Sequence, residues 1–214
     1  MIIDIYHNIL WSKYRGVVFS KLFRLQSKNQ FNFIQIAETE SDRKELGPVD
    51  LSYHNYPFRL MFNGSYDFVP KTRLITELFF SVFNSKAELV LFPGYHKAEY
   101  WAMLAAAVLT RKKRAVFCDS TIYDQPQSLI KGLLKRLFFS CCDGIFSYGE
   151  RGRSYVIHYG ASPARIFPRC QAAALSSGYS YENSLQQRVD LAPAAASTRF
   201  LYVGRLSPEK SLDV

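Results

Sequence analysis

The sequence has 214 residues, and 48% of them are hydrophobic, so the chain can bury a sizeable core and does not have the composition of a disordered protein. The formal net charge is +9, which indicates an anionic partner such as nucleic acid, acidic lipid or a phosphorylated substrate. The same charge can also serve solubility alone.

Strand-like and helix-like segments alternate up to residue 168. Short apolar runs predict strands over residues 2–6, 31–37, 58–62, 88–92, 115–118, 144–147 and 165–168. Amphipathic windows predict helices over residues 17–25, 72–83, 98–109, 128–141 and 150–158. This order predicts an α/β fold, a Rossmann-like and mostly parallel sheet with helices on both faces. Ligands of such sheets collect at the carboxyl ends of the strands.

The composition changes after residue 171. Residues 172–198 are rich in Ala, Ser and Gly, and residues 192–196 read Ala-Pro-Ala-Ala-Ala, which is typical of a linker. We therefore predict a first domain over residues 1–171, a linker over 172–198, and the start of a second, truncated domain over 199–214.

Neither a metal site nor a membrane span is expected. The four cysteines include no Cys-x-x-Cys pair, and the four histidines are scattered, so no zinc site is predicted. The N-terminus has no basic start before its apolar run, unlike a signal peptide, and the longest apolar run, residues 101–109, is too short to span a bilayer. These features predict a cytoplasmic protein.

The last residues form a recognisable pattern. An apolar run over residues 200–203 is followed by Gly204, Arg205, a helix start at Ser207-Pro208-Glu209, and Lys210. A strand, a basic loop and a helix N-terminus in this order are how α/β sheets hold phosphate groups. A solvated loop with two surface cations is the simpler alternative.

This string, Val-Gly-Arg-Leu followed after two residues by Glu-Lys, resembles the start of the donor domain of family-4 glycosyltransferases, which are retaining enzymes of the GT-B fold. The resemblance implies that Gly204, Arg205 and Lys210 contact the diphosphate of a nucleotide-sugar donor. Weaker matches at Gly94-Tyr95, Asp119-Ser120 and Tyr148-Gly149, among others, resemble the acceptor-side domain of the same family. The chain would then be the acceptor-side domain plus the first donor-domain strand.

Loops after the predicted strands supply candidate site residues. His96 can accept or relay a hydroxyl proton because its ordinary pKa lies near neutrality, and Glu99 is a second catalytic candidate. Glu99 can equally be a first-turn glutamate that complements its helix dipole. Asp119 and Ser120 are candidates for binding an acceptor hydroxyl, or for capping the segment that follows.

The loop after the first strand offers Arg15 and Gly16. Many family members have a glycine pair here through which the backbone reaches the donor diphosphate, whereas this chain has Gly16 alone. Gly16 is therefore a donor-binding candidate, and Arg15 can contact an acceptor headgroup or the donor. A surface basic loop is the alternative.

The predicted helix over residues 128–141 carries Leu and Ile on one face with Lys131, Lys135 and Arg136 among them. A basic amphipathic helix can lie on an anionic membrane. The simpler interpretation, which we favour at this point, is a core helix with a basic outer face. The basic, aromatic stretch over residues 13–28 also leaves peripheral contact with the inner face of a membrane open.

The sequence supports two functions. In the first, the chain is part of an enzyme that moves a sugar from a nucleotide-diphospho-sugar to a hydroxyl of a glycan or lipid-linked acceptor with retention, in polysaccharide or glycolipid assembly. The resemblance implies no cofactor and no essential metal. In the second, the chain is a non-catalytic remnant or a split subunit that binds an acceptor or membrane and needs another chain for its donor domain. No GxGxxG, Walker A or GxSxG string occurs, and no nucleic-acid module is visible.

Overall fold

The computed structural model describes residues 1–26, 28–123, 128–169, 173–175 and 178–190. The chain divides into two compact units, Met1–Ala174 and Leu175–Val214. In the second unit the described element is α6 (Tyr181–Asp190), a helix inside the segment predicted as a linker. The predicted strand at 200–203 and the start of the second domain lie outside the described residues.

Within the described residues, one sheet of seven parallel strands runs through the first unit in the order β3-β2-β1-β4-β5-β6-β7. The strands are β1 (Ile2–Ile9), β2 (Gln30–Thr39), β3 (Phe58–Ser65), β4 (Leu89–Phe92), β5 (Lys113–Cys118), β6 (Gly144–Tyr148) and β7 (Ile166–Arg169). All seven predicted strands are present, and the prediction of a Rossmann-like parallel sheet is confirmed.

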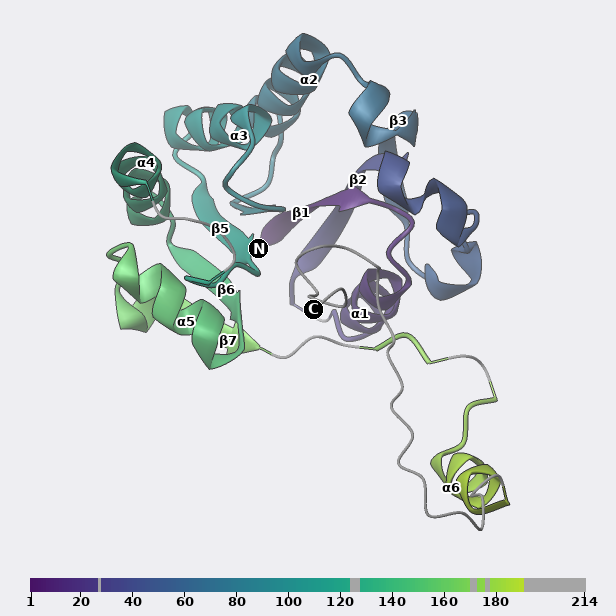
Figure 1. Cartoon of the computed structure of the whole chain (residues 1–214). Helices are drawn as coiled ribbons and strands as arrows, with labels where there is room; N and C mark the ends of the chain where they lie inside the picture. The colour runs from purple at the N-terminus through teal and green to yellow at the C-terminus, as the bar shows by residue number, and fades with distance from the viewer. Residues whose placement is uncertain (27, 124–127, 170–172, 176–177, 191–214) are drawn as a thin grey trace. The chain divides into compact units, whose positions relative to one another are not determined.

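Helices cover both faces of the sheet (Figure 1). They are α1 (Lys13–Arg24), α2 (Lys71–Phe83), α3 (Ala98–Leu109), α4 (Leu129–Ser140) and α5 (Gly149–His158), with the short 3-10 helices η1 (Ser41–Leu46), η2 (Leu51–Tyr53), η3 (Tyr66–Phe68) and η4 (Pro163–Arg165). Side chains of α2, α3, α4 and α5 share one apolar core, and α1 with its neighbours forms the other.

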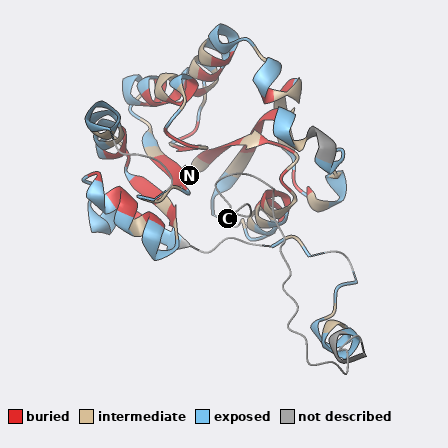
Figure 2. Cartoon of the chain, in the orientation of Figure 1, coloured by how far each residue is buried: buried red, intermediate tan, exposed pale blue. Residues whose placement is uncertain are grey.

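Successive side chains along each strand point to opposite faces of the sheet, so the strands contribute to both apolar cores. In β1, Ile5 points to the α1 side and Tyr6 to the opposite side, as expected for residues that alternate across a pleated strand. Figure 2 shows buried residues running along the strands between the two helix layers. Because the strands are buried on both faces, they are near-continuous apolar runs, which is why the sequence predicts them well.

Two of the boundaries that differ from the prediction lie near the carboxyl edge of the sheet. β1 continues past Tyr6 because β2 pairs with His7 and Ile9 along its length. α1 begins at Lys13 rather than at residue 17, so that Arg15 and Gly16 belong to its first turn and not to a loop. Residues that we predicted as loop therefore belong to β1 and α1, at the carboxyl edge of the sheet.

The α1 face of the sheet is covered only in part by the first unit. A groove of about 880 Å³ borders α1 and extends over apolar residues of the later strands, among them Leu91, Ala115, Phe117, Phe146 and Phe167. Among the described residues, α1 is the one helix that lines this groove.

Gly16 allows α1 to pack closely on η2. A Cβ at this position would lie 2.8 Å from the carbonyl oxygen of Tyr53 and 3.0 Å from the ring of His54. We expect Gly16→Ala to lower the free energy of unfolding by about 1–3 kcal/mol, because the backbone of η2 must move. Urea denaturation measures this change.

Gly152 in α5 is the matched control, because its added Cβ would meet other atoms no closer than 3.5 Å. Gly152→Ala should be neutral or raise the free energy of unfolding by up to about 1 kcal/mol, as alanine favours the helix. If both variants change stability in the same direction and to the same degree, the packing argument at Gly16 is wrong.

Candidate functional site

The carboxyl ends of the parallel strands meet at one edge of the sheet, and the order of the strands reverses between β1 and β4. The chain runs from β1 to β2 and β3 on one side, and from β4 to β7 on the other. Ligands of open α/β sheets bind in the crevice at such a reversal. The segments that border it here are the loop from β1 into α1 and the loop from β4 into α3.

On the α1 side, a buried chain of hydrogen bonds joins β1, β2 and η2. The Nδ1 of His7 donates to the carbonyl oxygen of Ile9 at 3.0 Å and lies 3.3 Å from the Oε1 of Gln35. Gln35 donates to the hydroxyl of Tyr56, which lies 2.8 Å from the Nδ1 of His54. Burial, together with the nearby Arg15, lowers the pKa of His7 to about 3, so His7 is neutral at pH 7. The cluster therefore presents a fixed, uncharged platform.

Arg15 lies beside this platform as a buried cation. Its guanidinium carbon is 4.4 Å from the ring centroid of Phe117 and 5.5 Å from that of Tyr148, at the carboxyl ends of β5 and β6. The side chain is buried, its Nε has no hydrogen-bond partner, and no carboxylate pairs with it among the residues that the structure describes. The first turn of α1 also contains no acidic residue. A buried positive charge thus lies near the carboxyl edge of the sheet with no counter-ion among the described residues, which corrects the alternative of a surface basic loop.

On the α2 side, Glu99 is held by aromatic residues. It is buried in the first turn of α3, and the hydroxyl of Tyr66 donates to its carboxylate. The ammonium of Lys97 lies 3.7 Å from the ring centroid of Tyr66, and the hydroxyl of Tyr100 donates to Asn8 of β1 at 2.6 Å. This arrangement favours a positioning role for Glu99, which ties α3 to η3, over direct contact with a substrate.

His96, by contrast, is exposed at the mouth of the crevice. Its ring makes edge contacts with Tyr95 and Tyr100, with centroids 5.9 Å and 5.7 Å apart. Partial burial lowers the pKa of His96, and the neighbouring Lys97 lowers it further, whereas Asp119 raises it. The imidazole is therefore largely neutral at pH 7 and able to accept a proton.

Hydroxyl groups connect the loop after β4 with the loop after β5. The hydroxyl of Tyr95 donates to the Oγ of Ser120 at 2.8 Å and lies 2.8 Å from the hydroxyl of Tyr155 in α5. Asp119 is exposed beside them. Ser147, at the end of β6, is fully buried, and its Oγ has no hydrogen-bond partner in the described part of the chain.

A hollow of about 500 Å³ opens next to these hydroxyls, between the loop after β5 and the first turns of α5. It is lined by Thr121, Ile122, Tyr123, Glu150, Arg151 and Ser154. The structure thus brings His96, Asp119 and Ser120 to one mouth, with Arg15 buried on the other face of the sheet.

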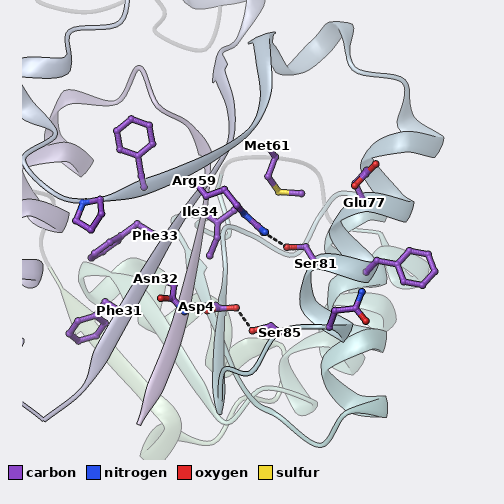
Figure 3. Close-up of a pocket in the computed structure, with 14 residues that line it drawn as sticks. Asp4, Phe31, Asn32, Phe33, Ile34, Arg59, Met61, Glu77, Ser81 and Ser85 are labelled. Carbon is purple, nitrogen blue, oxygen red and sulfur yellow. Dashed lines mark hydrogen bonds between the residues drawn. The ribbon is translucent and has the colours of Figure 1, made fainter.

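A larger hollow of about 640 Å³ lies away from this edge, between β1–β3 and α2 (Figure 3). Several of its polar groups already have partners, since Asp4 accepts hydrogen bonds from Asn32 at 2.8 Å and from Ser85, and Arg59 donates to Ser81. We therefore place the candidate site at the carboxyl edge and not in this hollow.

Gly204, Arg205 and Lys210 lie outside the described residues, so their donor contacts stay predictions. Gly16 is accounted for by its packing on η2, and a donor contact through its backbone also stays a prediction. Among the residues that the structure does describe, no group of three or more His, Cys, Asp or Glu side chains is arranged to hold a metal ion.

Sequence reasoning missed Gln35, His54, Tyr56 and Tyr66. They lie in or near β2, η2 and η3, and their partners are 2 to 33 residues distant in the sequence. No local motif marks them. The polar Gln35 inside the otherwise apolar middle of β2, residues 33–37, is the one signal that a buried polar cluster was present.

Comparison with known proteins concerns the fold. No protein-family model and no curated protein matches the sequence. A crystal structure of a UDP-N-acetylglucosamine 2-epimerase matches with a TM-score of 0.57 and 12% identity, covering 87% of this chain and 54% of that one. The enzyme of the same name from Rickettsia bellii matches with a TM-score of 0.55 and 14% identity over 88% of this chain and 47% of its own.

The HepE protein of Anabaena in complex with UDP-glucose matches with a TM-score of 0.53 and 10% identity, over 89% of this chain and 50% of that one. These similarities show that the chain has a GT-B-like fold, as predicted. The chain spans about half the length of these neighbours.

The lowered pKa of His7 makes stability depend on pH. The unfolded chain binds a proton near pH 6.5 while the folded chain resists it down to about pH 3, so stability is lost as the pH falls through this window. Between pH 7 and pH 5 we expect His7 to account for a loss of about 2 kcal/mol in the free energy of unfolding. Denaturant titrations of the wild type and His7→Gln test this, and equal pH slopes in the two proteins would contradict it.

The pKa of His96 can be measured directly. We expect its imidazole to titrate below the ordinary value of 6.5 in an NMR titration. Lys97→Gln should move the pKa upward because a nearby positive charge is removed, whereas Lys97→Arg should not. A wild-type pKa at or above 6.5 would show that the ring is fully solvated or paired with an anion.

Proposed function

We propose that this chain forms the acceptor-side half of a retaining glycosyltransferase. The enzyme would move a sugar from a nucleotide-diphospho-sugar to a hydroxyl of a glycan or lipid-linked acceptor. The proposal is supported by the GT-B-like fold and by the resemblance of the terminal string to family-4 enzymes. The observation that carries it is Arg15, a buried cation at the strand-order reversal that pairs with no carboxylate among the described residues.

Arg15 suits an anionic ligand in three ways. Its guanidinium is held in place by aromatic rings, so little side-chain freedom is lost on binding. Its charge is shielded from water, which strengthens its attraction to a phosphate. The amides at the N-terminus of α1 lie in the same turn and favour negative charge.

The acceptor would bind on the other side of the crevice. In glycosyl transfer the bond from the anomeric carbon to the diphosphate breaks, a bond to the acceptor oxygen forms, and the hydroxyl proton must leave. The neutral and exposed His96 is suited to take that proton. Asp119 and Ser120, which follow β5, would hydrogen-bond neighbouring hydroxyls of the acceptor.

The rest of the donor site would come from the second domain. Arg205 and Lys210 are proposed to neutralise the diphosphate as it leaves, with Gly204 allowing close approach. With cations and helix N-termini in this role, we expect no essential metal and no cofactor, and no nucleic-acid partner. A continuation of the chain or a partner chain would supply the remaining donor domain.

A second enzymatic function is favoured by the solved neighbours, several of which are UDP-N-acetylglucosamine 2-epimerases. In that case the sugar stays with its nucleotide and no acceptor is needed. A non-catalytic acceptor-binding subunit is the third candidate. Product analysis separates them, because only transfer joins the sugar to a second molecule.

Removal of the Arg15 cation should weaken nucleotide-sugar binding. We expect Arg15→Gln to raise the Kd for UDP-glucose or UDP-N-acetylglucosamine about 10- to 100-fold, because a charge-assisted hydrogen bond contributes about 1.5–3 kcal/mol. Arg15→Lys should raise the Kd by a smaller factor. Isothermal titration calorimetry measures the Kd, and circular dichroism confirms that the variants fold.

Lys13 provides the matched control, since it lies in the same turn but is exposed and paired with Asp50 at 3.1 Å. Lys13→Gln should change the Kd less than about threefold, as an exposed cation contributes little. If Arg15→Gln and Lys13→Gln change the Kd equally, or if a folded Arg15→Gln variant binds as the wild type does, Arg15 does not bind the nucleotide-sugar. The roles of Arg205 and Lys210 are tested in an enzyme that carries the full second domain. If its Arg205→Ala, Lys210→Ala variant turns over as fast as the unsubstituted enzyme, the two residues do not contact the donor.

A further inference from the structure

Helix α4 turns its apolar side away from the core. The α4 leucine face consists of five side chains at helical spacings of three and four, and their exposed fractions run from 50% at Leu134 to 90% at Leu129. Its members are Leu129, Ile130, Leu133, Leu134 and Leu137. This finding corrects the interpretation of α4 as a core helix with a basic outer face.

The opposite side of α4 attaches the helix to the protein. Phe138 and Phe139 are buried in the last turn, and Phe138 packs edge-on against Trp101 of α3 with centroids 5.1 Å apart. The ammonium of Lys135 lies 5.2 Å and 4.7 Å from the ring centroids of Tyr155 and Tyr159 in α5. The helix is thus fixed by these contacts, and the leucine face takes no part in them.

Cations border the leucine face, and α4 contains no acidic residue. Lys131 and Arg136 are both exposed, and by helical geometry they flank the five apolar side chains on opposite sides. An apolar strip edged by cations is complementary to a bilayer that offers acyl chains beneath anionic headgroups. Among the described residues, no helix is long and apolar enough to cross a membrane.

We propose that the α4 leucine face docks on the surface of an anionic lipid bilayer, with its leucines between the headgroups and Lys131 and Arg136 on lipid phosphates. A contiguous apolar surface of this kind on one helix marks an interaction site rather than a random scatter of exposed residues. The cations of α4 favour lipid over an apolar protein groove, which would provide no counter-charge.

Docking there would bring the bilayer near the candidate acceptor side. Lys135 of α4 contacts Tyr155, and the hydroxyl of Tyr155 lies 2.8 Å from that of Tyr95, which donates to Ser120. A lipid-linked acceptor would then approach these hydroxyls from the membrane. The docking surface itself does not depend on which reaction the protein performs.

Vesicle flotation tests the proposal with the full chain. We expect the wild type to bind phosphatidylglycerol-containing vesicles at least tenfold more tightly than pure phosphatidylcholine vesicles, and less tightly as salt rises. The triple variant Leu129→Gln, Leu133→Gln, Leu137→Gln should lose at least tenfold in binding. The matched control Leu25→Gln, Leu46→Gln, Leu51→Gln changes three leucines that are also exposed, and it should bind as the wild type does.

Charge is tested separately with Lys131→Gln, Arg136→Gln, which should reduce binding to anionic vesicles and leave weak binding to neutral ones unchanged. All substituted side chains are exposed, so thermal melts should stay close to that of the wild type.

Absence of vesicle binding, or equal loss in the α4 triple variant and its control, overturns the proposal. A wild-type dimer in light scattering that the α4 triple variant converts to monomer, without vesicle binding, assigns the face to a second copy of the chain instead.

Discussion

The position of β1 between β2 and β4 determines the rest of this structure. Because β1 pairs in parallel on both of its edges, the chain must leave it in one direction for β2 and return on the other side for β4. The strand order reverses at this point, and the segments that follow β1 and β4 at the carboxyl edge are those that carry Arg15 and His96. The chemistry of the candidate site thus follows from the pairing of one strand.

The two sides of this crevice differ in electrostatic character. On the α1 side, His7 is kept neutral by burial while Arg15 keeps its charge among aromatic rings. On the other side, Tyr95 and Ser120 present hydroxyls and His96 a neutral imidazole. The cation thus lies on one face of the sheet and the hydroxyl and imidazole groups lie on the other, and the proposed sugar transfer depends on this division.

The sequence predicts the strands and helices closely, because buried parallel strands are apolar runs and their connecting helices are amphipathic. It does not predict which way a helix faces. The periodicity of α4 identifies the leucine face, but only the contacts of Phe138 and Lys135 with distant helices show that this face points outward. For the same reason the bond between Tyr66 and Glu99, made across 33 residues, left no local signal. Local sequence patterns predict local structure, whereas the candidate site is formed by contacts between residues that are distant in the sequence.

The central place of β1 also bears on how the chain is made. β1 leaves the ribosome before β4, and the edge of β1 that pairs with β4 finds its partner only when β4 appears about 80 residues later. At the usual pace of synthesis, about 5–20 residues per second, that edge waits for roughly 4–16 s. During this interval the nascent chain carries an unpaired apolar strand that other chains could join. Yield in the cell should therefore depend on translation speed and on chaperones that shield the first segment.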